Sequence, residues 1–143
     1  MKKRLLLPVG LIIALLVPSV AFGAVVTFTG SFPNDSNASI TFNVKRVNGK
    51  NTRVINLSVR RFNVQCTKTG SQEIRTFNPI SIDKPVVQRH WNYNDGTTHF
   101  QGTFRRTNKN KADGTLEVTL TGIDFFGPTE NCHGGPRQFH AST

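Results

Sequence analysis

The longest strand-like run in the chain covers residues 52–66, and it restricts the possible folds more than any other stretch. Apolar residues occupy the odd positions Ile55, Leu57 and Val59, and polar residues stand between them. Alternation with a period of two places successive side chains on opposite faces of a strand. The run therefore predicts a strand with one buried face.

The alternation changes phase at Arg60 and Arg61, after which the apolar residues stand at even positions from Phe62 to Cys66. A slip of one residue would turn the second apolar set onto the wrong face of a regular strand. A β-bulge or bend corrects such a slip, so we expect one at the two arginines, within one bent strand or between two strands. Such a bulge is either purely structural or orients both arginines toward a ligand.

Similar alternation recurs along the rest of the chain after residue 23, and no stretch there has helical periodicity. The clearest hairpin signal is Asn48-Gly49, because both residues tolerate positive φ. About eight strands without helices predict an antiparallel β-sandwich, since such sheets must bury their apolar faces on one another. A closed β-barrel is the alternative.

Four segments in the second half of the chain have weaker patterns. Prolines in or beside residues 78–84 indicate an irregular segment or an edge strand. Residues 86–93 are predicted to form a strand, and residues 107–114 a polar, basic loop that ends in Asp113-Gly114. Residues 137–141 are predicted to form the last strand.

The amino terminus has the three-part pattern of a secretory signal peptide. Residues 1–4 carry positive charge, residues 5–20 are uncharged and mostly apolar, and small residues follow. We expect cleavage after Gly23, or alternatively after Ala21. Residues 1–23 are thus the expected signal peptide and residues 24–143 a single all-β domain. The apolar run is shorter than the roughly 20 residues of a spanning helix, so no permanent membrane anchor is expected.

The chain contains two cysteines, Cys66 and Cys132. Export brings a chain into an oxidising compartment, where disulfides persist. We therefore expect a disulfide between these two residues, and a secreted protein that is extracellular or associated with the cell wall.

Short motifs recur in a fixed order along the domain. They are Phe28-x-Gly30, Phe42-x-Val44, Val64-x-Cys66, Phe100-x-Gly102-x-Phe104, Ala112-x-Gly114-Thr115-Leu116 and Cys132-x-x-Gly135-x-x-x-Phe139-x-Ala141. In this order and spacing they resemble a loose group of small exported, disulfide-bonded, β-rich uncharacterised proteins, chiefly of actinobacteria. Phe139 is a departure, because a tryptophan is expected there. The resemblance implies an exported β domain, and it implies no activity, substrate or site residues.

The chain is strongly basic, with a net charge of +10, and removal of the three positive charges in the signal peptide leaves +7. Basic doublets lie at or near the ends of predicted strands: Lys45-Arg46, Arg60-Arg61 and Arg105-Arg106. If these ends share one rim, they form a positive patch that attracts cell-surface polyanions, acidic lipids or nucleic acid. No specific nucleic-acid motif is present. The alternative is a solvated rim that keeps the protein soluble.

The segment His90-Trp91-Asn92-Tyr93 holds the single tryptophan and the single tyrosine of the chain. Aromatic faces beside amide and imidazole groups can stack on sugar rings and bind their hydroxyls. The alternative is that Trp91 packs at the edge of the sandwich.

No catalytic, cofactor or metal site is expected. The carboxylates do not form the positioned pair that acid–base hydrolysis requires. The histidines lack helical metal-ligand spacing: His90, His99, His133 and His140. The sequence therefore predicts a non-enzymatic binding domain for polyanions, with Arg60, Arg61, Arg105 and Arg106 as its candidate ligand-binding residues. The alternatives are a carbohydrate-binding module that uses Trp91 and Tyr93, a hydrolase whose residues converge only in the fold, and a ligand-free structural protein.

Overall fold

The structure is a computed structural model that describes residues 23–67, 70, 72–123 and 130–143. The expected signal peptide, apart from Gly23, lies outside the described residues. Within the described ranges, no helix is long and apolar enough to cross a membrane.

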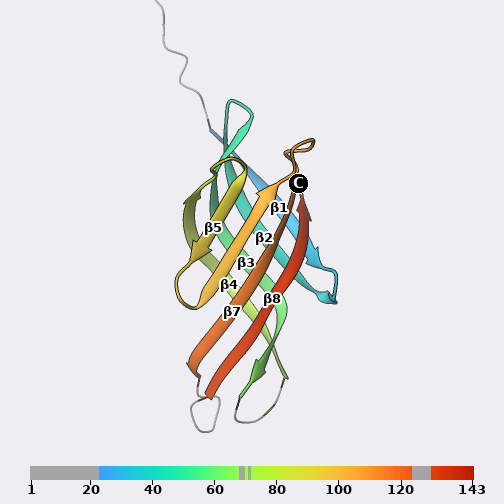
Figure 1. The fold of residues 1–143 in the computed structure, drawn as a ribbon, viewed down its shortest axis with the longest axis vertical. Coiled ribbons are helices and arrows are strands. Elements are labelled where there is room, and N and C mark those ends of the chain that lie inside the picture. Colours follow the sequence, from blue (N-terminus) through green and yellow to red (C-terminus); the bar gives the residue numbers. More distant parts are fainter. Residues whose placement is uncertain (1–22, 68–69, 71, 124–129) are drawn as a thin grey trace, which may run out of the picture.

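The alternating segments of the sequence form eight strands (Figure 1). Their bounds are β1 Ala24–Phe32, β2 Asp35–Val47, β3 Lys50–Cys66, β4 Gln72–Pro85, β5 His90–Asn94, β6 Thr98–Phe104, β7 Lys111–Ile123 and β8 Glu130–Ser142. The prediction of an all-β fold with about eight strands is confirmed.

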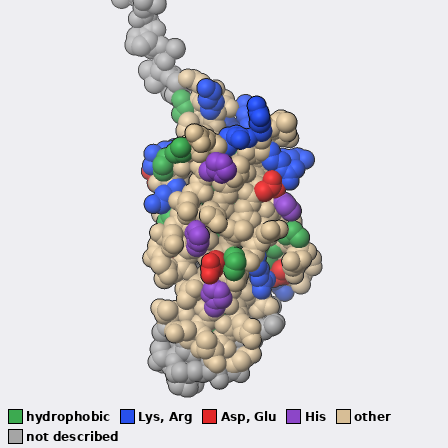
Figure 2. All heavy atoms as spheres, in the orientation of Figure 1, with side chains coloured by type: hydrophobic (Ala, Val, Ile, Leu, Met, Phe, Trp, Pro, Cys, Tyr) green, Lys and Arg blue, Asp and Glu red, His purple; other side chains and the backbone are tan. Residues whose placement is uncertain are grey.

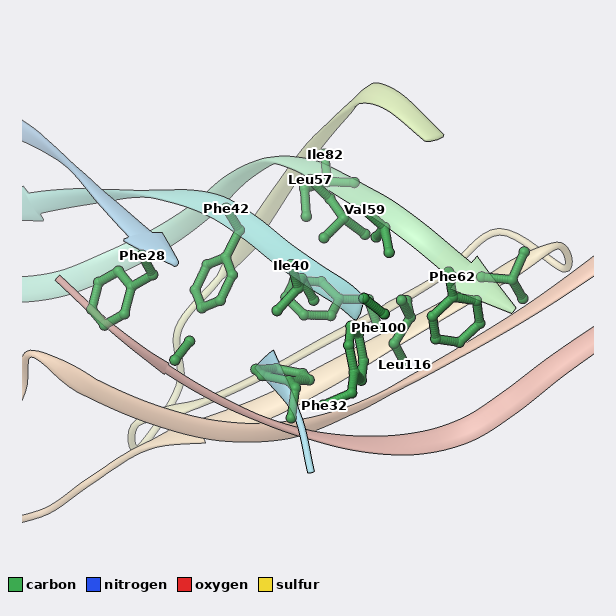
Figure 3. Close-up of a cluster of buried hydrophobic side chains, with 14 of the residues drawn as sticks. Phe28, Phe32, Ile40, Phe42, Leu57, Val59, Phe62, Ile82, Phe100 and Leu116 are labelled. Carbon is green, nitrogen blue, oxygen red and sulfur yellow. The ribbon is translucent and has the colours of Figure 1, made fainter. Parts of the chain in front are cut away.

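All strands belong to one antiparallel sheet with the order β4-β3-β2-β1-β8-β7-β6-β5. This sheet folds over between β1 and β8, so that β1–β4 face β5–β8 across the core (Figures 1 and 3). A further pairing between β3 and β8 closes β1, β2, β3 and β8 into a ring of four strands. The fold therefore combines the two predicted architectures: it has the two layers of a sandwich and contains a closed barrel-like ring.

Two seams join the layers through β8. At the first seam, Gly30 of β1 pairs with Ala141 of β8. A Cβ atom on Gly30 would lie 2.8 Å from the Ala141 Cβ, so only glycine lets the two strands approach this closely. At the second seam, Cys66 of β3 pairs directly with Cys132 of β8, and the predicted disulfide joins them.

The core between the layers is dominated by aromatic rings (Figure 3). Phenylalanine supplies seven of the largest fully buried side chains: Phe28, Phe32, Phe42, Phe62, Phe100, Phe104 and Phe139. The ring of Phe42 on β2 lies 5.3 Å from that of Phe100 on β6 and 6.1 Å from that of Phe139 on β8, measured between centroids. Aromatic pairs at such distances add to the stabilisation from burial, so these rings hold the two layers together.

The predicted bulge lies where the phase of the alternation changes. Arg61 has a φ of 55°, and the pairing of β3 with β4 shifts between Val59 and Phe62. Val59 and Phe62 are consequently both buried although they lie an odd number of residues apart. The bulge prediction is confirmed, and residues 52–66 belong to one long, bent strand.

Three segments differ from the prediction. Residues 86–89 form a turn rather than the start of a strand, because Gln88 and Arg89 both have positive φ and backbone hydrogen bonds join Val87 to His90. Residues 111–114 belong to β7 rather than to a loop. Residues 78–84 belong to the edge strand β4, which agrees with one of the two predicted alternatives. The last strand begins before residue 137, since β8 includes Cys132.

Replacing both cysteines, Cys66→Ser with Cys132→Ser, should lower the free energy of unfolding by about 4 kcal/mol, because the disulfide closes a long loop in the unfolded chain. The two cysteines are 66 residues apart. Urea unfolding of the oxidised wild type and the double variant measures the difference. Chemically reduced wild type is the control and should match the variant; equal stability of all three would contradict the prediction.

Candidate functional site

A hollow of about 320 Å³ lies where three connections meet at one end of the molecule: the β2–β3 turn, the turn at residues 86–89 and the loop at residues 105–110. Its lining includes five basic residues, and no described lining residue is acidic. The basic residues are Lys50, Arg89, Arg105, Arg106 and Lys109. Figure 2 shows lysine and arginine side chains gathered at this end. We call this site the basic hollow.

Hydrogen bonds between the two layers position the loop at residues 105–110. Lys109 donates from Nζ to the Gly49 carbonyl oxygen at 2.9 Å. The side chains of Arg46 and Asn51 donate to the Lys109 carbonyl oxygen at 3.2 Å and 3.0 Å. The β2–β3 hairpin turn, at which Asn48 and Gly49 have the predicted positive φ, is thus tied to the opposite layer.

Most of the positive charge in the basic hollow has no negative partner among the described residues. The side chains of Lys50, Arg89 and Arg106 make no hydrogen bond or ion pair with the part of the chain that the structure describes. Lys109 bonds to a carbonyl oxygen, which carries no net charge. All four side chains are exposed. By contrast, Arg105 donates two hydrogen bonds to the carboxylate of Asp113, at 2.7 Å and 2.8 Å.

A second hollow, of about 570 Å³, lies on the outward face of β5, β6 and β7. Polar side chains line it in pairs from the three strands: His90 and Asn92, Gln101 and Thr103, Asp113 and Thr115. Pro85 and Val87 form one side. We call this site the polar hollow.

The alternation of the strands produces two polar rows in this hollow. One row consists of His90, Thr103 and Asp113, which pair across the three strands, and the other of Asn92, Gln101 and Thr115. Residues of the row between them point inward, because the strands alternate. In that row Gly102 and Gly114 have no side chain, and an added Cβ atom would collide with the ring of Trp91 or of Phe139. The core therefore fixes the backbone that forms the floor of the polar hollow.

The two hollows share a wall. Val86, Gln88 and Arg89 line the basic hollow, while Pro85, Val87 and His90 line the polar hollow, so the turn at residues 86–89 lies between them. The ion pair of Arg105 and Asp113 also lies at this boundary, because Arg105 lines the basic hollow and Asp113 lines the polar hollow.

Asp113 is the acidic residue at this junction. The hydrogen bonds from Arg105 hold the pKa of its carboxyl at about 2, against the opposing effect of burial and with help from His140, whose Nδ1 lies 2.6 Å from Oδ1. Asp113 is therefore ionised at neutral pH and cannot donate a proton. No second carboxylate belongs to the described lining of the polar hollow. The described lining of the polar hollow therefore lacks the carboxylate pair that a hydrolase of this kind needs. The hydrolase alternative stays an untested prediction.

The arginine doublets do not share one rim. Arg105 and Arg106 lie in the basic hollow, whereas Arg60 pairs with Ser39, roughly 30 Å along β3 from Lys50. Arg61 follows Arg60 in the bulge, where its backbone N–H donates to Thr76. The condition of a common rim is therefore not met by the two arginine doublets, because β3 is one continuous strand that carries Arg60 and Arg61 away from this end of the molecule.

The indole of Trp91 is buried, with an exposed fraction of 3%. The rings of Phe42, Phe100 and Phe104 pack around it, at 4.8 to 5.6 Å between centroids, so it has no free face for a sugar. Tyr93 lies on the same side of β5, with its hydroxyl donating to Asp95 at 2.7 Å and the Lys84 ammonium 5.7 Å from its ring centroid. The residues of this segment that face outward are His90 and Asn92.

Sequence reasoning missed Lys50 and Arg89. Lys50 directly follows the Asn48-Gly49 turn, so the hairpin signal already placed it at the same end as Arg46. Arg89 lies in a segment that the alternation assigned to a strand, and no glycine or proline marks the turn there.

The histidines lie on the outward face of β5–β8, and three of them lie beside the two acidic residues of β7. His140 contacts Asp113, while His99 and His133 lie 4.0 Å and 3.5 Å from Glu117. Among the described residues, no group of three or more metal-ligating side chains could hold a metal ion.

The sequence matches no known family model and no curated protein, and the structure matches no solved structure. The resemblance to small exported proteins of actinobacteria stays a prediction from the motifs.

Replacing Asp113→Asn should lower the free energy of unfolding at about pH 5 by about 1 kcal/mol, since solvent screens part of the ion pair. The pKa of Asp113 is lowered from 3.8 to about 2 in the folded protein. Its stabilisation is therefore fully present above about pH 4 and is lost as the pH falls through about 2. Urea unfolding of both proteins from about pH 5 to about pH 2 should show the difference disappearing. A difference that stays constant over this range would contradict the assignment.

Proposed function

We propose that the protein is an exported, non-enzymatic binding domain that acts at or outside the cell surface and binds polyanions at the basic hollow. The observation that carries this proposal is the convergence of four exposed positive charges without negative partners in the described part of the chain: Lys50, Arg89, Arg106 and Lys109. Like charges gathered at one place repel one another, and an anionic ligand removes that repulsion.

The chemistry of these side chains suits an anionic polymer. Guanidinium groups bind carboxylate, sulfate or phosphate oxygens through two parallel hydrogen bonds. Arg89 and Arg106 are both exposed, and no described residue occupies either edge of their guanidinium groups. The hollow is about 320 Å³, at the lower end of the roughly 300–1,000 Å³ of ligand sites, so it accommodates one segment of a longer chain.

The location outside the cell is supported by two features. The disulfide between Cys66 and Cys132 is of the kind that persists in oxidising compartments. The amino-terminal pattern is that of a signal peptide, and removal of residues 1–23 would leave the strongly basic domain intact.

Replacing Arg89→Gln with Arg106→Gln should weaken binding to polyglutamate by about fivefold or more, because an exposed ion pair contributes up to about 1 kcal/mol. Isothermal titration calorimetry or retention on immobilised polyglutamate measures the effect. Raising the salt from about 0.1 M to about 1 M shortens the Debye length from about 10 Å to about 3 Å and should largely abolish binding by the wild type.

The matched control is Arg60→Gln with Arg61→Gln. Each pair removes two positive charges and contains one arginine with positive φ, Arg61 at 55° or Arg89 at 74°. The control variant should bind polyglutamate like the wild type. Equal weakening by the two variants would show that net charge alone governs binding, and retention of no polyanion at low salt would leave the proposal without support.

A further inference from the structure

We infer that the ligand of the basic hollow is an acidic polysaccharide, whose sugar hydroxyls bind in the adjacent polar hollow. The inference rests on the proposed polyanion binding and adds a second site, with a different chemistry, to it. In this assignment the anionic groups lie against Lys50, Arg89, Arg106 and Lys109, and the sugar rings lie over the outward face of β5–β7.

The first support is the arrangement of the two hollows. They lie on either side of the turn at residues 86–89 and of the ion pair between Arg105 and Asp113, which has a closest N–O distance of 2.7 Å. Thr103 in the polar hollow precedes Arg105 in the basic hollow by two residues, which corresponds to about 7 Å of extended chain. A polymer that lies across this boundary reaches both sites within a few of its units.

The second support is the mixed hydrogen-bonding capacity of the polar hollow. Sugar hydroxyls donate and accept, so they need both kinds of partner. The Asn92 amide, which offers both, makes no hydrogen bond with the described residues. Gln101 donates from Nε2 to the Thr115 hydroxyl at 3.2 Å, and its side-chain carbonyl oxygen has no hydrogen bond to a described residue. The Nδ1 atom of His90 is hydrogen-bonded to the Thr103 hydroxyl at 2.7 Å, and its Nε2 atom has no partner within the described ranges.

The third support is the rigidity of these positions. The polar side chains stand on three paired strands, where neighbouring strands are about 4.8 Å apart and alternate residues about 7 Å apart. Rings of Trp91 and Phe139 pack beneath the glycines of the floor. A ligand binds to a site on such elements without a large entropic cost for ordering the protein side chains.

The charge of Asp113 does not exclude an anionic polymer from the polar hollow. Both carboxylate oxygens accept hydrogen bonds from Arg105, and His140 contacts one of them. The carboxylate is thereby neutralised within the protein, so the described lining of the polar hollow holds no unpaired negative charge.

Other polyanions fit these surfaces less well. Single-stranded nucleic acid is bound through exposed aromatic rings on which bases stack. Trp91 is buried, and Tyr93 is half-buried beside the Lys84 ammonium. A domain that binds an acidic membrane surface typically has several exposed apolar side chains around its cations. Among the described residues that line the two hollows, Val87 is the only exposed large hydrophobic residue.

The test compares two carboxylate polymers of equal length, polygalacturonate and polyglutamate. Each carries one carboxylate per unit, and only polygalacturonate has sugar hydroxyls. The protein without residues 1–23 is titrated with each polymer by calorimetry at low salt. It should bind polygalacturonate about tenfold more tightly than polyglutamate, as expected for a few additional hydrogen bonds. Asn92→Ala with Gln101→Ala should abolish this preference and leave polyglutamate binding unchanged.

The matched control is Thr27→Ala with Asn43→Ala, which removes a hydrogen-bonded polar pair from β1 and β2 in the opposite layer. It should keep the preference, and thermal unfolding should verify that both variants are folded. Equal binding of the two polymers by the wild type, or a preference that survives Asn92→Ala with Gln101→Ala, would overturn the inference and leave polyanion binding intact. Tighter binding of a single-stranded oligonucleotide than of polygalacturonate would also overturn it. Failure to bind any of these polymers would reject the proposed function itself.

Discussion

A single sheet has to cover its own apolar face in this protein, because the described chain contains no helix that could do so. The sheet meets this constraint by folding between β1 and β8, which brings β1–β4 over β5–β8. Gly30 allows the strands at the fold to approach, and the disulfide between Cys66 and Cys132 fixes the second seam. The aromatic core, the hydrogen bonds between the layers and the basic hollow all depend on this closure.

The same constraint separates the core from the candidate site. On β5–β7 the inward positions are used by Trp91, Gly102 and Gly114, together with the large rings around them. The outward positions are consequently free to carry polar groups at regular spacing. A tryptophan in a polar segment suggested a sugar-stacking platform, whereas its two neighbours, His90 and Asn92, are the residues that reach the surface.

Features that depend on local sequence could be predicted. The strands follow from alternation, the bulge from the change of phase at Arg60 and Arg61, and the disulfide from the presence of two cysteines. Asp113-Gly114 has the composition of a turn, yet it lies within β7 because Gly114 packs against Phe139, which is distant in the sequence. Likewise, Lys50, Arg89 and Arg106 meet only because the layers close. Such features require the strand order, which local patterns do not contain.

The central claim is that one anionic sugar chain occupies both hollows, and mapping by NMR tests it most directly. Backbone amide shifts of the isotope-labelled protein would be followed during titration with a short oligogalacturonate. The account predicts changes at the β2–β3 turn, at residues 85–92 and 101–115, and no change at the bulge of Arg60 and Arg61. Changes confined to the basic hollow, or centred on the outward face of β1–β3, would contradict it.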